Sequence, residues 1–329
     1  MKVIIESKIP FIAGVLEPLG VTVEYLSPDA ITPEAIRDAD ALIVRTRTKC
    51  DRALLHDSSI SFIATATIGT DHLDLPYLRS RSITAVNAPG CNAPAVAQYV
   101  WAAIDSWQKR HSRHRVLTVG VVGAGHVGSI VAQWGESMGH RMLLCDPPRA
   151  IAEGSGSFTS LDKIAEEADI ITFHTPLIID GNFPTYHLFD RKLAESLKCQ
   201  PLIINSSRGP VADTQALIDA LDSGKISDAA IDTWEGEPDI DRKLLNRTFI
   251  ATPHIAGYSL EGKKRATTMV LDALTNHFGL PKVYISDPAP LDIPAIITPR
   301  QIAYDPSIDT ANLKAHPEQF ELQRNNYPL

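Results

Sequence analysis

The chain has 329 residues and a hydrophobic content of 44%, which predicts about two globular domains with substantial buried cores. Its net charge of −8 is spread without long single-sign runs, and this excludes the basic surface of a nucleic-acid-binding protein. No apolar run approaches the length of a membrane span, and the N-terminus lacks a signal-peptide pattern. Cys50, Cys91, Cys145 and Cys199 lack a metal-binding spacing and indicate reduced thiols. We therefore expect a cytoplasmic protein with no metal and no nucleic-acid or membrane partner.

Short apolar runs alternate with helical and turn patterns in the N-terminal part of the chain. Strands are predicted at residues 3–5, 21–25, 41–44 and 62–66, with helices at residues 10–19 and from residue 33. This alternation is typical of a doubly wound parallel α/β domain. Turn residues at 87–92 then lead into a long apolar helical pattern at 93–109, which we expect to cross between two domains.

A strand pattern at residues 116–122 leads directly into a glycine-rich turn and an amphipathic helix. In such a turn the first glycine permits a tight bend, the second lets the backbone approach a pyrophosphate, and the third allows close helix–strand packing. The helix N-terminus directs its N–H groups at the phosphates. The following strand ends at an acidic residue placed to bind the ribose hydroxyls and to favour NAD. The predicted cofactor contacts are Gly123, Gly125, His126, Val127, Gly128 and Asp146.

Further buried-strand patterns occur at residues 170–174, 202–205, 228–232 and 249–252. In open α/β sheets, ligands bind outside the carboxyl ends of the strands, so we sought reactive side chains there. Removing a hydride from a carbinol carbon also requires a base for the hydroxyl proton.

Three residues near these strand ends fit that chemistry. His254 is the candidate base because the pKa of imidazole lies near neutrality. Glu237 would orient that imidazole, and the planar guanidinium of Arg208 would bind a substrate carboxylate bidentately. Taken singly, each also fits a structural role, such as a buried histidine or a helix cap.

A polar loop follows the predicted strand 41–44. The run Arg45-Thr46-Arg47-Thr48-Lys49 combines hydroxyls with cations that suit a phosphate or a carboxylate. A solvated basic loop is the alternative, and it is the preferred interpretation for Arg47 and Lys49. His72 and His174 are expected to be structural.

Three motifs follow the glycine-rich turn in a fixed order: NxxRG at 205–209, DxWExEP at 232–238 and TPHIAG at 252–257. In this combination the chain resembles the D-isomer-specific 2-hydroxyacid dehydrogenase family over about residues 1–280. Four stretches, 87–92, 144–149, 173–177 and 252–262, resemble one member that acts on a phosphorylated 2-hydroxy acid. The resemblance implies NAD as cofactor and the catalytic set Arg208, Glu237 and His254. It also implies cofactor contacts at Asp146, Thr175, Asp232 and Gly257, and substrate contacts at Thr46, Thr67 and Tyr258. Arg45, in the same loop as Thr46, is added as a candidate substrate contact.

The implied architecture is two doubly wound parallel-sheet domains, with a Rossmann NAD-binding domain inserted into a flavodoxin-like substrate domain. We expect the substrate domain at 1–92, the NAD-binding domain at 93–256, a return to the substrate domain at 257–282, and an extended proline-rich tail at 283–329. The similar member continues into a longer C-terminal dimerisation domain, whereas this sequence ends at Leu329. A homodimer through the helix 93–109 and the cofactor domain is therefore expected.

Two other functions fit the same motifs. A D-2-hydroxyacid dehydrogenase for 3-phosphoglycerate, glyoxylate or hydroxypyruvate would share the catalytic residues and differ in the first-domain loop and around Tyr258. An NAD(H)-sensing corepressor would bind the cofactor without turnover. The complete set of Arg208, Glu237 and His254 favours an enzyme.

Overall fold

The computed structural model describes residues 1–112, 115–285 and 304–328, which form two compact units. Unit 1 comprises residues 1–92 and 259–285, and unit 2 comprises residues 93–112, 115–258 and 304–328. Each unit has its own sheet and its own buried core.

The sheet of unit 1 has the strand order β2-β1-β3-β4-β5, and all neighbouring strands are parallel. This order confirms the predicted flavodoxin-like arrangement. The central strands are continuous apolar runs because both faces of the sheet are covered. The elements are β1 (Lys2–Glu6), η1 (Glu17–Leu19), β2 (Thr22–Leu26), η2 (Pro28–Ala30), α1 (Pro33–Ile36), β3 (Ala41–Val44), α2 (Arg52–Leu55), β4 (Phe62–Thr65), α3 (Leu75–Ser80), β5 (Thr84–Val86) and α11 (Leu260–Phe278).

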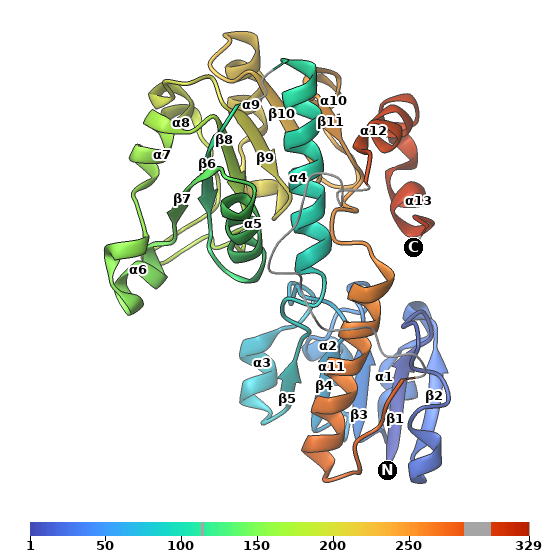
Figure 1. Cartoon of the computed structure of the whole chain (residues 1–329). Coiled ribbons are helices and arrows are strands. Elements are labelled where there is room, and N and C mark those ends of the chain that lie inside the picture. Colours follow the sequence, from blue (N-terminus) through green and yellow to red (C-terminus); the bar gives the residue numbers. More distant parts are fainter. Residues whose placement is uncertain (113–114, 286–303, 329) are drawn as a thin grey trace. The chain divides into compact units, whose positions relative to one another are not determined.

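Different parts of the chain cover the two faces of this sheet. Helix α11 lies against one face, beside β4, and buries Val270, Leu271 and Leu274 there (Figure 1). Helices α1, α2 and α3 cover the other face, and they contribute Ile36 and Leu78 to a second core. The first sheet is thus completed by a helix that is distant in sequence.

The predicted helix at residues 10–19 is wrong, since only η1 is helical there. Phe11 and Gly14 adopt left-handed φ angles of 64° and 75°, which interrupt a right-handed helix. Ile12 and Leu16 are nevertheless buried against the sheet. The apolar spacing therefore reflects a loop packed on the core.

The sheet of unit 2 has the order β11-β10-β9-β8-β6-β7, again with parallel neighbours throughout. The chain moves from β6 to β7 on one side and then returns to β8 on the other, so the topological switch point lies between β6 and β8. The elements are α4 (Ala93–Arg110), β6 (Thr118–Val122), α5 (His126–Ser137), β7 (Arg141–Cys145), α6 (Pro147–Glu153), η3 (Ser155–Ser157), α7 (Leu161–Glu167), β8 (Ile170–Phe173), α8 (Arg191–Ser196), β9 (Leu202–Asn205), η4 (Gly209–Val211), α9 (Thr214–Asp222), β10 (Asp228–Ile231), α10 (Arg242–Arg247), β11 (Ile250–Ala251), α12 (Pro306–Ala315), η6 (Pro317–Gln319) and α13 (Phe320–Asn325).

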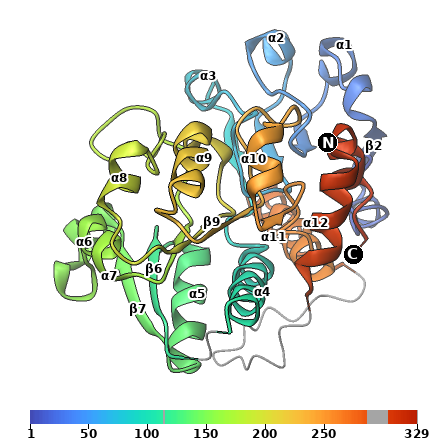
Figure 2. The same ribbon diagram turned by 90° about the horizontal axis from the view of Figure 1, so that it is seen from above.

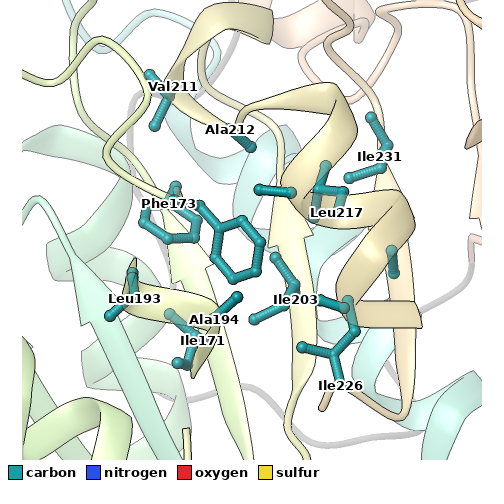
Figure 3. Packing of buried hydrophobic residues seen from close by; sticks show 14 of the residues in the cluster. Ile171, Phe173, Leu193, Ala194, Ile203, Val211, Ala212, Leu217, Ile226 and Ile231 are labelled. Atoms are coloured by element: carbon teal, nitrogen blue, oxygen red, sulfur yellow. The ribbon is translucent and has the colours of Figure 1, made fainter. Parts of the chain in front are cut away.

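Helices cover both faces of this second sheet. Helices α4 and α5 lie side by side on one face and bury Trp101, Trp107 and Trp134 (Figure 2). Helices α7 to α10 cover the other face, where Phe173 and Ile203 lie within a continuous apolar cluster (Figure 3). The doubly wound prediction is therefore confirmed for unit 2 as well.

The expected extended tail at 283–329 is wrong for residues 304–328, which fold into α12, η6 and α13. Leu313 and Phe320 from these helices are buried in the core of unit 2. Prolines obscured the helices in the sequence, although Pro306 and Pro317 occupy first-turn positions that proline tolerates. The part of the predicted tail at 286–303 lies outside the described residues.

Within the described residues, no helix is long and apolar enough to cross a membrane. No group of three or more His, Cys, Asp or Glu side chains in that part of the chain is arranged to hold a metal ion. All four cysteines are free thiols, and Cys50, Cys91 and Cys145 are buried. Burial raises the pKa of the Cys145 thiol to about 11.

Leu274 provides a test of the packing between α11 and the first sheet. Its side chain is fully buried, so we expect Leu274→Ala to lower the free energy of unfolding by about 2–5 kcal/mol. The control is Leu260→Ala on the same helix, where the leucine is 37% exposed and the change should stay near 0.5 kcal/mol. Urea unfolding measures both, and equal losses in the two variants would contradict the packing.

Candidate active site

The glycine-rich turn joins β6 to α5 at the switch point. Gly123 has a left-handed φ of 90°, and a Cβ atom there would lie 2.8 Å from the carbonyl of His174. A Cβ on Gly128 would lie 2.0 Å from the carbonyl oxygen of Gly123, so only glycine allows the helix to pack here. A Cβ on Gly125 would meet nothing within 4 Å. Two glycines are therefore required by crowding, and the middle one leaves open space.

This turn fits a dinucleotide. Gly125 is the N-cap of α5 and provides no capping side chain, so His126 and Val127 begin the helix without a side-chain acceptor. Backbone N–H groups at such a helix end bind phosphate oxygens. The open space at Gly125 allows a pyrophosphate to approach the backbone closely.

Asp146 stands at the end of β7, as the sequence predicts for a ribose-binding acid. Its Oδ2 accepts the N–H of Ala124 at 2.9 Å, and its Oδ1 accepts the N–H of Arg149 at 3.1 Å as the N-cap of α6. Arg149 also donates to the carbonyl oxygen of Ala124. Asp146 thus connects the adjacent strand to the glycine-rich turn, while its contact with a ribose remains a prediction.

Two buried hydroxyls lie across the switch point from the glycine-rich turn. Thr175 follows β8 and Ser206 follows β9, and neither Oγ atom has a hydrogen-bond partner among the described residues. A buried hydroxyl without a partner is destabilising, which favours a ligand as the missing partner. Thr175 was predicted as a cofactor contact; Ser206 was not, and only its buried, unpartnered state singles it out.

The neighbouring His174 has a structural role, as expected. Its Nε2 lies 2.9 Å from the Oγ1 of Thr172. Burial lowers the pKa of His174 to about 3, so this imidazole stays neutral at physiological pH. His174 is therefore unsuited to proton transfer.

The predicted base and its carboxylate form a hydrogen-bonded pair. His254 Nδ1 lies 2.9 Å from Glu237 Oε2, and the other oxygen of Glu237 accepts the N–H of Trp234 at 2.8 Å. Burial alone would raise the pKa of Glu237, but the hydrogen bond and charge of His254, with smaller contributions from Trp234 and Arg324, lower it overall. The carboxylate is thus held ionised beside the imidazole.

The loop that carries His254 is held by a buried carboxylate. His254 has a left-handed φ of 58°, a conformation that costs a non-glycine residue about 1–2 kcal/mol. Asp232 offsets this cost because it accepts the N–H groups of Ile255 at 2.8 Å and Ala256 at 3.1 Å. It also accepts the hydroxyl of Thr252 at 2.7 Å.

Asp232 was predicted to contact the cofactor, but the structure shows a different set of partners. Its side chain is almost completely buried and holds the loop of residues 252–256. Burial raises the pKa of Asp232, while the charge of His254 and the three hydrogen bonds oppose that rise. Asp232 is therefore a positioning residue for His254, and its contact with a cofactor remains a prediction.

The turn that carries Arg208 packs directly on the turn that carries Glu237. A Cβ on Gly209 would lie 1.9 Å from the carbonyl oxygen of Trp234, so these two backbones are in close contact. Asn205 fixes the first turn by donating to the carbonyl oxygen of Arg208 at 3.0 Å. The three predicted catalytic residues thus follow the neighbouring strands β9, β10 and β11.

The remaining predicted substrate residues in the N-terminal part belong to unit 1. Arg45 and Thr46 follow β3, where the N–H of Arg45 donates to Glu6 at 2.9 Å. Thr67 follows the neighbouring strand β4, and its Oγ1 lies 2.7 Å from the hydroxyl of Thr65. Lys49 forms an ion pair with Asp51, and its side chain is 78% exposed. This favours a solvated surface loop over a substrate contact for Lys49. Gly257 and Tyr258 belong to unit 2, directly after the His254 loop.

Comparison with known proteins identifies the family. Residues 94–256 match the NAD-binding domain of the D-isomer specific 2-hydroxyacid dehydrogenases. An erythronate-4-phosphate dehydrogenase from Bacteroides thetaiotaomicron is 48% identical over 335 residues, with 100% of this chain and 96% of the relative covered. The chain belongs to the erythronate-4-phosphate dehydrogenase family. A relative of the same name from Cronobacter sakazakii is 40% identical over 99% of this chain and 91% of its own length.

Solved structures with lower sequence identity share the fold. A D-lactate dehydrogenase from Aquifex aeolicus, complexed with NAD and lactic acid, has a TM-score of 0.67 at 24% identity and covers 84% of this chain and 95% of its own. A glyoxylate reductase from Paecilomyes thermophila has a TM-score of 0.70 at 20% identity over 86% and 98% of the two chains. The predicted family and the NAD-dependent dehydrogenase class are thus confirmed by the family match and the full-length relatives.

The glycine-rich turn of residues 123–128 together with Asp146 is here called the cofactor cradle. A comparison of two of its glycines tests whether it binds NAD. Gly125→Ala should preserve the melting temperature, because a Cβ there meets no protein atom, yet weaken NADH binding at least about fivefold by filling the space near the pyrophosphate. Gly128→Ala should instead lower the melting temperature, because its Cβ collides with Gly123. Gly156→Ala, also in open space, is the control. Fluorescence titration with NADH and thermal unfolding measure these effects, and unchanged NADH affinity in Gly125→Ala would contradict this cradle.

The lowered pKa of Glu237 predicts a pH dependence of stability. A carboxyl whose pKa is lower in the folded than in the unfolded state stabilises the fold above its unfolded pKa, and this contribution disappears as the pH falls through the folded value. Wild-type protein should therefore lose more stability than Glu237→Gln between pH 7 and about pH 3. Urea midpoints at both pH values measure this, with the exposed Glu136→Gln as the control. Equal losses in wild type and Glu237→Gln would refute the assignment.

Proposed function

We propose that this chain oxidises the C2 hydroxyl of 4-phospho-D-erythronate with NAD⁺ to give 2-oxo-3-hydroxy-4-phosphobutanoate, a step of pyridoxal 5′-phosphate biosynthesis. The observation that carries the proposal is the 2.9 Å hydrogen bond between His254 and Glu237, which lies at the strand ends of a dinucleotide-type sheet. Full-length relatives named for this activity, at 40–48% identity, support the choice of substrate.

The cofactor fits the cradle described above. Gly123, Gly125, His126, Val127 and Gly128 would bind the pyrophosphate, with Asp146 at the ribose. Thr175, Ser206 and Gly257 are placed at other strand ends or the adjoining loop of the same sheet. NAD⁺ bound there supplies the hydride acceptor.

His254 is the proposed general base. When Nδ1–H donates to Glu237, Nε2 is left with a lone pair that can accept the proton of the C2 hydroxyl. Glu237 keeps the imidazole in this tautomer and stabilises the imidazolium that forms. Arg208 would bind the substrate carboxylate beside the reacting carbon, because a guanidinium binds a carboxylate bidentately.

The other end of the substrate would be bound by side chains that suit a phosphorylated chain. Arg45 and Thr46 provide a cation and a hydroxyl after β3, and Thr67 adds a hydroxyl after β4. Tyr258 would contact the substrate from the loop that carries His254. We also propose that the enzyme is a homodimer, as the resemblance implies.

A substrate panel tests this proposal. Initial rates with NAD⁺ should give the highest kcat/KM for 4-phospho-D-erythronate, and much lower values for 3-phosphoglycerate, glycerate and D-lactate. The reverse reaction should be assayed with glyoxylate and hydroxypyruvate. A higher kcat/KM for another acid would keep the dehydrogenase mechanism and replace the substrate. NADH binding without turnover of any acid would instead support a cofactor-sensing protein.

The same assay tests the role of His254. His254→Ala should lower kcat about 10²- to 10⁴-fold, the usual contribution of general base catalysis, while NADH affinity stays close to wild type. His316→Ala is the control, because that imidazole is exposed on the surface. Retention of wild-type kcat in His254→Ala would remove this residue from the mechanism.

A further inference from the structure

We infer that the C-terminal segment, residues 304–328, positions the substrate side of the active site through a contact between Tyr327 and Tyr258. The inference rests on the proposed function for its kinetic consequence only. Its structural part concerns the loop of residues 252–258, here called the histidine loop, which carries His254 and ends at Tyr258.

The C-terminal segment packs on β11, the strand that directly precedes the histidine loop in the sequence. Strand β11 is a short edge strand, and α12 packs beside it (Figure 1). The hydroxyl of Thr310 on α12 accepts the N–H of Ala251 at 3.1 Å. Lys314 on the same helix donates to the carbonyl oxygen of Thr248. Helix α12 therefore satisfies backbone groups that an uncovered sheet edge would leave to solvent.

One carboxylate in α12 holds two tyrosines that lead to opposite ends of the histidine loop. Asp309 Oδ2 accepts the hydroxyl of Tyr304 at 2.7 Å and the hydroxyl of Tyr327 at 3.1 Å. The ring of Tyr304 lies 5.9 Å from that of Tyr99. The hydroxyl of Tyr99 lies 2.9 Å from Thr252, which begins the loop.

The second tyrosine contacts the other end of the loop. The edge of one ring of the Tyr327–Tyr258 pair meets the face of the other, with centroids 6.0 Å apart and an interplanar angle of 87°. Tyr258 also donates its N–H to Ile255 at 2.8 Å, which connects it to the residues held by Asp232. The histidine loop is thus held at its start through Tyr99, at its middle by Asp232 and at its end by Tyr327.

Arg324 on α13 gives independent support for this arrangement. Burial alone would raise the pKa of Glu237, and Arg324 is among the charged groups that lower it. Helix α13 therefore lies close enough to the His254–Glu237 pair to act on it electrostatically. Arg324 lies in the last turn of α13, and Tyr327 follows directly after this helix.

The predicted consequence is a separation between substrate and cofactor effects. Loss of the Tyr327 ring removes one contact that restrains Tyr258, which is proposed to contact the substrate, while Asp232 continues to hold His254. Substrate binding should therefore weaken more than proton transfer. The cofactor cradle is formed by β6, α5 and β7 and should be unaffected.

The experiment compares Tyr327→Ala and Tyr327→Phe with the control Asn325→Ala, whose exposed side chain lies at the end of α13, two residues before Tyr327. Tyr327→Ala should raise KM for 4-phospho-D-erythronate about three- to tenfold, the usual range for loss of an aromatic pair, with kcat and KM for NAD⁺ within about twofold of wild type. Tyr327→Phe keeps the ring and should be closer to wild type. Asn325→Ala should change neither constant.

Backbone amide exchange gives a readout that does not require turnover. The N–H of Tyr258 should exchange faster in Tyr327→Ala than in wild type. Its exchange rate should be unchanged in Asn325→Ala. Wild-type KM together with wild-type exchange at Tyr258 would overturn the inference. Equal increases in KM for 4-phospho-D-erythronate and for NAD⁺, with a lowered melting temperature, would show that Tyr327 only stabilises the fold. That result would also overturn the inference. If wild-type protein oxidises no 2-hydroxy acid, the proposed function fails, while the exchange comparison still decides the role of Tyr327.

Discussion

The buried carboxylate of Asp232 is the interaction on which the active site depends. It lies at the end of β10 and accepts two backbone N–H groups and one hydroxyl from the chain that follows the neighbouring strand β11. Without this acceptor, those buried donors would lose their hydrogen bonds, which is costly away from water. His254 also needs the support, since its left-handed backbone conformation is unfavourable for a side chain with a Cβ. The position of His254 therefore depends on the hydrogen bonds that Asp232 accepts from the backbone of this loop.

Two carboxylates in the same site are used differently because their surroundings differ. Burial would raise the pKa of both, but Glu237 faces His254 and the charge of Arg324, and its pKa is lowered overall. Asp232 is more deeply buried, and its pKa is raised despite its donors. The first carboxylate can stabilise an imidazolium as it forms, whereas the second holds the loop in place. Residue type alone does not separate these roles.

The glycine-rich turn shows a comparable division between packing and ligand space. Gly123 and Gly128 are surrounded by backbone atoms, so the fold itself requires glycine at both positions. Gly125 faces open space, which leaves room for the proposed approach of a cofactor to the backbone. The hydroxyl of Thr175, which follows the adjacent strand β8, is buried and has no hydrogen-bond partner among the described residues. The glycine-rich turn and the strand ends that carry Arg208, Glu237 and His254 belong to one sheet, so the proposed dinucleotide site and the proposed base share one scaffold.

From the sequence alone, most of the strands, the glycine-rich turn and the candidate catalytic residues could be predicted, because these depend on short-range patterns. Buried parallel strands are continuous apolar runs, and the spacing of Gly123, Gly125 and Gly128 follows from local backbone geometry. Tertiary structure decided the features that depend on distant contacts. Residues 10–19 are apolar at helical intervals yet pack as a loop. Pro306 and Pro317 begin helices, and the first of these, α12, packs on the edge strand β11. The partners of Asp232 and the contact of Tyr327 with Tyr258 join residues brought together only by folding, so no local pattern specifies them.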